Sequence, residues 1–346
     1  MSTKVGLAHC EPDRYTMGDR FLITGATGFI GSALSQYLLE AGHPVRGAVR
    51  ASTRIPRRVI SESANLEWVV LHDHSTEREI DEALQGVQIV VHLAARVHVM
   101  ADDASDPLHE FRQVNCVWTE RLAARAAAQG VLRFVYLSSV KVNGEQTIVP
   151  FTEQDLPNPQ DSYGVSKWEA EQALARVSMQ TGMETVIVRS PLVYGPGVRG
   201  NFLQLLSILR RGMPLPLASI RNQRSLVYLG NLVDALARCI QDRRAAGQTY
   251  LVRDGEDLST PELVRRLSLA MESSVCLWPC PTSLLYWMGQ AAGKRGVIDR
   301  LVGSLQVNSS KIQTELDWHP PFSVDAGLSE TAVWFRSRTH NLVGAV

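Results

Sequence analysis

The feature that most constrains this chain is residues 21–31, FLITGATGFIG, with the helix-like run that continues to residue 41. Three apolar residues at its start are typical of the end of a buried strand, and apolar residues recur at helical spacing after its end. Between them, Gly25, Gly28 and Gly31 form a glycine-rich turn. A strand, a glycine-rich turn and a helix in this order predict the start of a dinucleotide-binding βαβ unit.

Each glycine has a physical role in such a unit. Gly25 allows the tight turn, Gly28 lets the backbone approach a pyrophosphate, and Gly31 lets the helix pack against the strand. The free N–H groups at the start of the helix face the anion. The alternative interpretation is a purely structural turn, because three glycines alone are a weak signal. The expected cofactor contacts in this segment are Gly25, Thr27, Gly28, Phe29, Ile30 and Gly31.

Composition places the chain among ordinary globular proteins. Its 346 residues should bury roughly three quarters of the unfolded surface, which permits one large α/β domain with an appended lobe or two modest domains. The formal net charge is zero, so nothing in it favours a nucleic acid or an anionic membrane surface as partner. The five cysteines are odd in number and scattered, which indicates reduced thiols in a cytoplasmic protein, and zinc is not expected because Cys276 and Cys280 lack a second pair of ligands.

The start of the chain does not have the pattern of a signal peptide. Residues 1–19 are polar and lack an apolar core, so we expect an N-terminal extension, with Met17 as an alternative start. The chain has no uninterrupted apolar run of about 18 residues, so we expect no membrane span. Its best apolar candidate, residues 283–293, is too short and is interpreted as a buried or amphipathic helix.

Short apolar strands alternate with helical patterns in the first half of the chain. We expect strands at 20–24, 45–49, 67–71, 88–93, 133–138 and 185–189, and helices at 30–41, 77–85, 107–129 and 161–181. This alternation predicts the α/β fold class, with a doubly wound parallel sheet covered on both faces. Ligands of such sheets bind beyond the carboxyl ends of the strands.

The composition of the chain changes after residue 190, where Gly, Pro and Arg become frequent. Helices are expected there at about 201–211, 230–241, 260–271 and 325–338. We therefore expect a dinucleotide-binding domain over 20–190, with some later segments returning to it. A smaller C-terminal lobe, mainly for substrate, is expected over 191–346.

The end of the second strand bears on the choice of cofactor. NAD-binding units usually carry an acidic residue here, which accepts hydrogen bonds from the ribose diol. Arg50 stands at this place, and a guanidinium suits a 2′-phosphate instead. Arg54, Arg57 and Arg58 add positive charge nearby, although each of these arginines is equally consistent with a solvated basic loop. NADP is therefore preferred, and NAD stays open.

Two further strand ends provide candidate cofactor contacts. Asp73, just past the third strand, has a carboxylate that accepts a hydrogen bond from an adenine amino group. Leu93, Ala94 and Ala95 follow His92 at the end of the fourth strand. Because these side chains are mostly small, the backbone can lie against the cofactor there.

Residues 162–171, SYGVSKWEAE, contain the candidate catalytic pair. Tyr163 and Lys167 are four residues apart, so they share one face of a helix. A nearby lysine ammonium favours the phenolate, so we expect the pKa of Tyr163 to be lowered from its usual value near 10. Tyr163 would then exchange a proton with an alcohol while hydride moves at its carbon. Ser139, at the end of the fifth strand, is placed to donate to the same oxygen.

The chain resembles the extended short-chain dehydrogenase/reductase family, in the NAD-dependent epimerase/dehydratase branch that acts on nucleotide sugars. TGATGFIG, HLAA, the Asn115 segment, SS-x-x-x-x-G, YGVSK and RSPLVYGPG occur in the family's order, from about residue 20 to residue 335. The resemblance implies a Rossmann-type domain with a C-terminal sugar-nucleotide lobe. It also implies that Ser139, Tyr163 and Lys167 are the catalytic set and that Lys167 contacts the nicotinamide ribose.

Departures from the family pattern narrow the reaction. Sugar-nucleotide 4,6-dehydratases carry an Asp-Glu pair where this chain has Val140 and Lys141, which disfavours dehydration. Asn143 replaces a tyrosine that many relatives carry. The runs VKVNGE and RVHVM (96–100) are similar to reductases of UDP-4-keto-6-deoxy-N-acetylhexosamines, which serve O-antigen synthesis. They are also similar to UDP-glucose and UDP-N-acetylglucosamine 4-epimerases.

The C-terminal lobe supplies the candidate substrate contacts. By resemblance, Asn201 and Arg224 bind the diphosphate of the sugar nucleotide, and a guanidinium suits phosphate oxygens. Asn231 replaces an aspartate of the family, which leaves that contact in doubt. An aromatic cluster follows, and we favour a core role for it over stacking on uracil. The cluster consists of Trp278, Tyr286 and Trp287.

We therefore expect an NADP- or NAD-dependent oxidoreductase that transfers hydride at C4 of a UDP-hexose, preferably as a 4-keto reductase. The first alternative is a 4-epimerase, which must retain its cofactor. An alternative of another class is a regulator that binds NADP without chemistry. The family implies a homodimer through helices 107–129 and 161–181, although the same apolar faces would also suit packing on the sheet.

Overall fold

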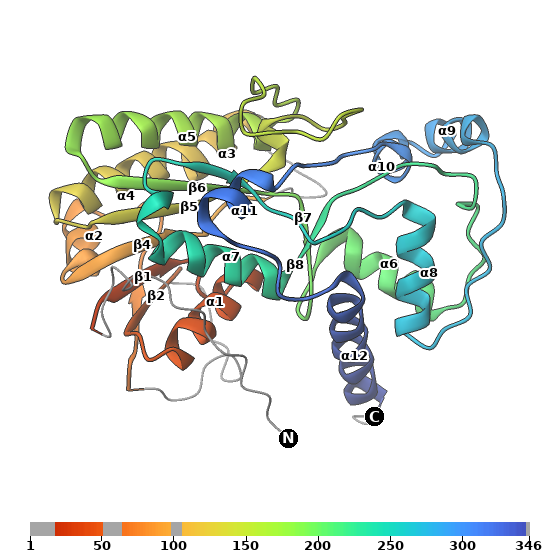
Figure 1. The fold of residues 1–346 in the computed structure, drawn as a ribbon, viewed down its shortest axis with the longest axis horizontal. Helices are drawn as coiled ribbons and strands as arrows, with labels where there is room; N and C mark the ends of the chain where they lie inside the picture. The colour runs from red at the N-terminus through yellow and green to blue at the C-terminus, as the bar shows by residue number, and fades with distance from the viewer. Residues whose placement is uncertain (1–17, 51–63, 98–105, 344–346) are drawn as a thin grey trace.

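A computed structural model describes residues 18–50, 64–97 and 106–343. Its centre is a parallel sheet of seven strands in the order β3-β2-β1-β4-β5-β6-β9 (Figure 1). The strands are β1 (Arg20–Thr24), β2 (Val45–Val49), β3 (Leu66–Val70), β4 (Val87–His92), β5 (Arg133–Ser139), β6 (Glu184–Ser190) and β9 (Thr249–Leu251). The order reverses between β1 and β4, and such a switch point opens a crevice at the carboxyl ends of the strands. The α/β doubly wound prediction is confirmed.

Helices cover both faces of the sheet, and the alternation along the strands explains why. In β1, Leu22 belongs to one apolar cluster, whereas Phe21 and Ile23 belong to the other. The first cluster packs under α2 (Glu77–Leu84), α4 (Trp118–Ala128) and α5 (Ser162–Thr181). The second packs under α1 (Phe29–Glu40) and α7 (Leu229–Gln241), on the opposite face in Figure 1.

The expected helix over 107–129 is helical throughout but not uniform. It consists of α3 (Pro107–Arg112), a π-helical turn (Gln113–Val117) and α4. A π-turn inserts one extra residue into the helix, and such turns often mark functional sites.

The second half builds a smaller lobe. Its elements are β7 (Leu192–Tyr194), α6 (Gly200–Arg210), β8 (Leu226–Tyr228), α8 (Thr260–Ala270), α9 (Thr282–Ala291), α10 (Arg295–Val302) and α12 (Val324–Val343), whereas α11 (Ser310–Leu316) packs against β9 of the large sheet. Strands β7 and β8 pair in parallel as a separate two-stranded sheet. The division of the chain at residue 190 stays a prediction. Two segments after residue 190 pack with the large sheet, because β9 pairs with β6 and α7 packs on α1.

The predicted core role of the aromatic cluster is wrong for both tryptophans. Trp278 is 43% exposed and Trp287 is 69% exposed, while Tyr286 is partly buried. In the described part of the chain, no helix has the length and apolar character needed to cross a membrane.

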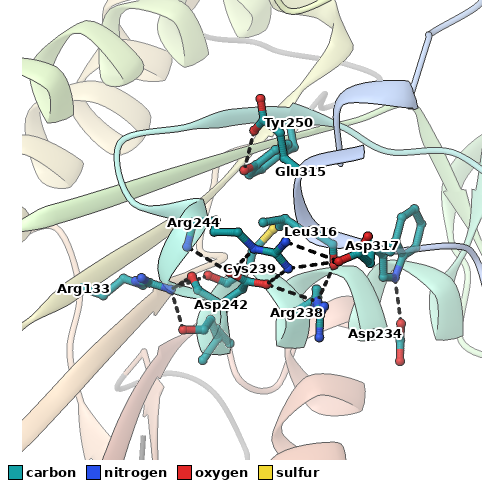
Figure 2. A network of polar contacts seen from close by, with 12 residues as sticks. Arg133, Asp234, Arg238, Cys239, Asp242, Arg244, Tyr250, Glu315, Leu316 and Asp317 are labelled. Carbon is teal, nitrogen blue, oxygen red and sulfur yellow. Dashed lines mark hydrogen bonds and ion pairs between the residues drawn. The ribbon is translucent and has the colours of Figure 1, made fainter. Parts of the chain in front are cut away.

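A buried arginine joins the two halves of the chain. Arg133 of β5 is fully buried, and its Nη1 donates to the carbonyls of Cys239, Ile240 and Asp242 at 2.9, 2.7 and 2.8 Å (Figure 2). These carbonyls lie at the end of α7, where helical partners are missing and a cation is favourable. The Nε of Arg133 donates to Glu184 of β6 at 2.9 Å. One side chain thus connects two strands of the sheet to the helix that covers it.

Candidate active site

The carboxyl end of β5 and the first turns of α5 bring Ser139, Tyr163 and Lys167 together. Asp161 caps α5 by accepting a hydrogen bond from the backbone N of Gly164 at 2.7 Å. Tyr163 and Lys167 follow one helical turn apart, and Ser139 forms a hydrogen bond with Tyr163. The three predicted catalytic residues therefore face one another across the β5–α5 junction.

Lys167 is held by the sheet. Its side chain is 2% exposed, and its Nζ donates to the carbonyl of Leu137 in β5 at 2.8 Å. The same Nζ lies 4.4 Å from the ring centroid of Tyr136 and 5.9 Å from that of Tyr163. Burial lowers the pKa of Lys167 to about 7, although the charge of Glu171 acts in the opposite direction.

Tyr163 differs from the sequence-based expectation. Burial raises its pKa, the charge of Asp161 adds to the increase, and only the hydrogen bond with Ser139 opposes it. The prediction that Lys167 lowers the pKa of Tyr163 is wrong in this structure, because a buried phenolate is poorly solvated. The phenol therefore carries its proton at neutral pH and can donate it.

The glycine-rich turn lies at the switch point between β1 and β4. Gly25 has a φ of +70°, and a Cβ there would lie 3.0 Å from the backbone N of Ala94, just after β4. The N–H of Gly28 donates to the carbonyl of Gly25 at 2.8 Å and closes the turn. Helix α1 begins next, with no side-chain cap and no acidic residue in its first turn. Its first N–H groups lack helical partners and suit an anion, so this segment fits a dinucleotide pyrophosphate.

Gly31 has the tightest surroundings in this turn, so we expect Gly31→Ala to destabilise the fold by about 1–3 kcal/mol. A Cβ at this position would lie 2.1 Å from the carbonyl oxygen of Gly25 and 2.8 Å from its carbon, so backbone must move. The measurement is urea unfolding, together with titration of NAD and NADP. Gly255→Ala is the matched control, because a Cβ there meets nothing within 4 Å. Equal stability of the two variants would show that the close approach of α1 to the turn is not required.

A chain of buried side chains behind the turn was not identified from the sequence. The Oγ1 of Thr24 accepts from the N–H groups of Leu93 and Ala94 at 3.2 and 3.1 Å, and it lies 2.7 Å from Nδ1 of His92. Nε2 of His92 lies 3.0 Å from Oγ1 of Thr119, whose hydroxyl donates to the carbonyl of Asn115. Thr119 therefore accepts from Nε2, so Nδ1 is the acceptor for the Thr24 hydroxyl.

Burial and the charge of Lys167 lower the pKa of His92 to about 3, so this ring is neutral. These hydrogen bonds fix the backbone of Leu93 and Ala94, which is predicted to lie against the cofactor. The sequence shows only that His92 lies at the end of a buried strand. It does not show the partners of the ring, because Thr119 and Thr24 lie 27 and 68 residues away along the chain.

Asn115 connects the end of β4 to α5. Its Oδ1 accepts from the N of Arg96 at 2.8 Å, and its Nδ2 donates to the carbonyl of Arg96 and to Oγ of Ser166, both at 3.0 Å. Asn115 lies in the π-helical turn, which aims its side chain at the residue preceding Lys167. The sequence marked this segment only through its resemblance to the family.

A buried ion pair supports the other side of the catalytic group. Arg189 of β6 donates to both carboxylate oxygens of Glu171 at 3.0 and 2.6 Å, and Ser138 donates to the same carboxylate at 2.5 Å. Nη1 of Arg189 also donates to Asn143 at 3.1 Å. Asn143, which departs from the family pattern, therefore helps to fix the β5–α5–β6 junction.

Lys141 occupies a position where 4,6-dehydratases of the resembling family carry an acid. Its Nζ lies 2.5 Å from Asp161 and 2.7 Å from Glu145. These two carboxylates raise the pKa of Lys141 against the opposing effect of its burial. At this position the lysine is protonated and paired with two carboxylates, so it provides no base for proton abstraction.

The remaining cofactor candidates lie at the expected strand ends. Arg50 is exposed directly after β2. Asp73 is partly buried after β3, and its backbone carbonyl accepts from Arg121 at 3.0 Å. Ala95 is partly buried after β4. Thr27, Phe29 and Ile30 lie in the glycine turn and the first turn of α1. Arg54, Arg57, Arg58 and residues 98–100 lie outside the described residues.

The substrate candidates have unequal surroundings. Asn201 is exposed in the first turn of α6. Arg224 is largely buried, and its Nη1 donates to the carbonyls of Arg300 and Gly303, both at 2.9 Å. Within residues 18–50, 64–97 and 106–343, its Nε and Nη2 have no hydrogen-bond partner, so two donors stay available for an anion.

The departure at Asn231 has a local explanation. Its Nδ2 donates to the carboxylate of Asp254 at 2.7 Å and to the carbonyl of Phe322 at 2.9 Å. An aspartate at this position would bring two carboxylates together and remove both donors. Asn231 therefore has a structural role in this chain.

Comparisons with known proteins agree with this geometry. The model of the NAD dependent epimerase/dehydratase family matches residues 21–252. A UDP-glucose 4-epimerase of Vibrio cholerae is 41% identical over 94% of this chain and 98% of its own length. An N-acetyl-α-D-glucosaminyl-diphospho-ditrans,octacis-undecaprenol 4-epimerase of Escherichia coli O157:H7 is 24% identical over 91% of this chain and 95% of its own.

Among solved structures, the UDP-glucuronic acid 4-epimerase of Bacillus cereus in complex with NAD has a TM-score of 0.74 at 19% identity. The match covers 92% of this chain and 99% of that one. This likeness supports the fold. With the glycine turn, the Ser139, Tyr163 and Lys167 group and the family match in hand, the chain belongs to the NAD-dependent epimerase/dehydratase family of extended short-chain dehydrogenases/reductases and is an NAD-dependent enzyme.

Proposed function

We propose that the protein transfers hydride at C4 of a UDP-hexose. The observation that carries this proposal is the assembly of Ser139, Tyr163 and Lys167 at the carboxyl end of β5, on the same edge of the sheet as the glycine turn that follows β1. The substrate class follows the full-length Vibrio cholerae relative, whose name gives UDP-glucose as its substrate.

The nicotinamide cofactor, when bound, supplies or accepts the hydride. The hydroxyl of Tyr163 donates its proton to the C4 oxygen in the reductive direction and takes it back in the oxidative direction. The hydroxyl of Ser139 donates to the same oxygen and holds it against Tyr163. The Nζ of Lys167, with a pKa of about 7, carries a proton part of the time at neutral pH, which stabilises the phenolate when Tyr163 has given up its own.

The net reaction that we place first is 4-epimerisation. Both relatives described above are named as 4-epimerases, and one of them is 41% identical along nearly the whole chain. In an epimerase the three residues first oxidise C4, the keto sugar turns over in the site, and reduction follows on the other face. Such an enzyme must retain its cofactor between the two half-reactions.

The second candidate is net reduction of a 4-keto UDP-N-acetyl-6-deoxyhexosamine for surface polysaccharide such as O-antigen. Two observations favour it. Tyr163 is held as a protonated phenol, which suits the donation of a proton to a keto oxygen. Arg50 is exposed at the end of β2, where it suits the 2′-phosphate of an exchanging NADPH. The family match supports NAD, and NADP stays a proposal.

The test begins with protein purified without added cofactor, which is denatured so that any released nucleotide can be identified. Retained NAD, together with interconversion of UDP-glucose and UDP-galactose or of their N-acetylated forms, would support the epimerase. A protein that binds NADPH and oxidises it only with a 4-keto UDP-sugar would support the reductase. Cofactor binding without turnover of any of these sugars would favour the regulator and contradict the proposal.

The assembly and location of the protein also stay predictions. Helices α4 and α5 pack on each other, and the apolar side chains of Val117, just before α4, and of Met179 in α5 are exposed, which is compatible with a homodimer. A cytoplasmic location is expected from the scattered thiols alone.

A further inference from the structure

Helices α9 and α10 form a helical hairpin with one apolar outer face. Leu284, Trp287 and Met288 of α9 lie three and four residues apart, so they share one stripe of the helix. Leu284 is 43% exposed, Trp287 is 69% exposed and Met288 is 47% exposed. Trp278, just before α9, and Val297 of α10 are exposed as well.

The inner seam of the hairpin accounts for only a few of its residues. In α9 only Leu285 and Gly289 are buried, and in α10 no residue is buried. Gly289 lets the helices meet, because a Cβ there would lie 2.4 Å from Cγ1 of Ile298. The outer stripe is therefore not required to hold the hairpin together, and so much exposed apolar area on one short element indicates an interaction surface.

The charges beside this stripe are mostly positive. The hairpin (282–302) carries one acidic residue, Asp299 of α10, against Arg300 of the same helix and against Lys294 and Arg295 at the point where the two helices meet. Both side chains are exposed, and within the described residues neither forms an ion pair. The zero net charge of the whole chain conceals this local excess of cations.

The hairpin lies at the outer end of the smaller lobe, remote from the seven-stranded sheet (Figure 1). Its second helix is nevertheless connected to the candidate substrate site. The carbonyls of Arg300 in α10 and of Gly303 just after it accept the two hydrogen bonds of Arg224. Arg224, the predicted diphosphate contact, is therefore hydrogen-bonded directly to α10 and to the residue after it, so a surface that binds the hairpin would lie close to this contact.

We propose that the α9–α10 hairpin docks on the surface of an anionic lipid bilayer. Trp287, Met288 and Leu284 insert at the level of the headgroups, where tryptophan is favoured, and the helix lies in the plane of the interface. Lys294 and Arg295 contact the anionic headgroups. The chemistry of the occupant follows from these two features together: an apolar stripe for the acyl boundary and a basic rim for its charge. The proposal does not depend on which sugar the enzyme uses.

The test is sedimentation of the full-length protein with vesicles of phosphatidylglycerol and phosphatidylethanolamine, compared with vesicles of phosphatidylcholine. Binding to the anionic vesicles, weakened by salt, is expected. The double variant Trp287→Ser, Met288→Ser should lower the partition coefficient at least about tenfold. The double variant Lys294→Glu, Arg295→Glu should lower it at least about thirtyfold on anionic vesicles only.

Leu269→Ser is the matched control, because Leu269 of α8 is also an exposed apolar residue of the same lobe. This variant should bind vesicles like the unaltered protein, and thermal unfolding should show that all variants are folded. No binding to anionic vesicles would overturn the proposal, and so would binding that the α9 variant leaves unchanged. Self-association that only the α9 variant abolishes, without vesicle binding, would assign the face to a second copy of the chain instead.

Discussion

Replacing Tyr163 with phenylalanine should lower kcat about 10²–10⁴-fold and leave the affinity for the dinucleotide within a few-fold of its original value. The ring would still fill its place at the β5–α5 junction, but the hydroxyl that bonds with Ser139 would be gone. The measurement is steady-state turnover of the sugar nucleotide, with cofactor binding followed by fluorescence.

Tyr37→Phe provides the control, because Tyr37 lies on the surface of α1 and loses the same hydroxyl. It should retain full turnover. A Tyr163→Phe enzyme that turns over at the original rate would remove Tyr163 from the chemistry. A variant that fails to bind the dinucleotide would indicate a role in binding instead.

The second large effect is expected at Arg133. Arg133→Met should destabilise the protein by about 3–5 kcal/mol, because it leaves Glu184 and three carbonyls at the end of α7 without their shared cation. This loss is a large part of the roughly 5–15 kcal/mol that stabilises a typical domain. The measurement is the free energy of unfolding from a urea titration.

Arg244→Met tests whether the loss of stability at Arg133 comes from its buried position in the network or from the loss of any paired arginine. Arg244 also forms ion pairs, with Asp242 and Asp317, but its side chain is 51% exposed (Figure 2). Its removal should cost no more than about 1 kcal/mol. Similar losses for the two variants would contradict the view that burial and the carbonyls of α7 make Arg133 important.

The strands that the sequence predicted are those with the strongest local signal. Leu22 and Ile23, followed directly by Gly25, combine apolar character with turn chemistry, and β1 was predicted with its observed bounds. Strands β7, β8 and β9 are three residues each, too short to show a period, and they were missed. Helix spacing likewise placed Tyr163 and Lys167 on one face, because that relation is local.

Relations between distant segments could not be predicted in this way. Arg133 appears in the sequence as an isolated cation in a strand, and its carbonyl acceptors lie 106, 107 and 109 residues further on. The pKa of Tyr163 was predicted in the wrong direction because a neighbouring charge can be inferred from spacing, whereas burial depends on the whole fold. Trp287 was assigned to the core because helical spacing shows which residues share a face but not what covers it.

The position of β9 has a consequence for synthesis of the chain. The strand that completes the sheet begins about 60 residues after the end of β6, and the carbonyls that Arg133 requires lie about 50 residues after it. At about 5–20 residues per second, a ribosome takes roughly 3–12 seconds to cover this distance. During that interval the edge of β6 has no strand to pair with and is open to strands of other nascent chains. The time of greatest risk of aggregation therefore falls while β7, α6 and β8 are being made and before the rest of the smaller lobe, and a pause in translation between residues 190 and 251 would prolong it.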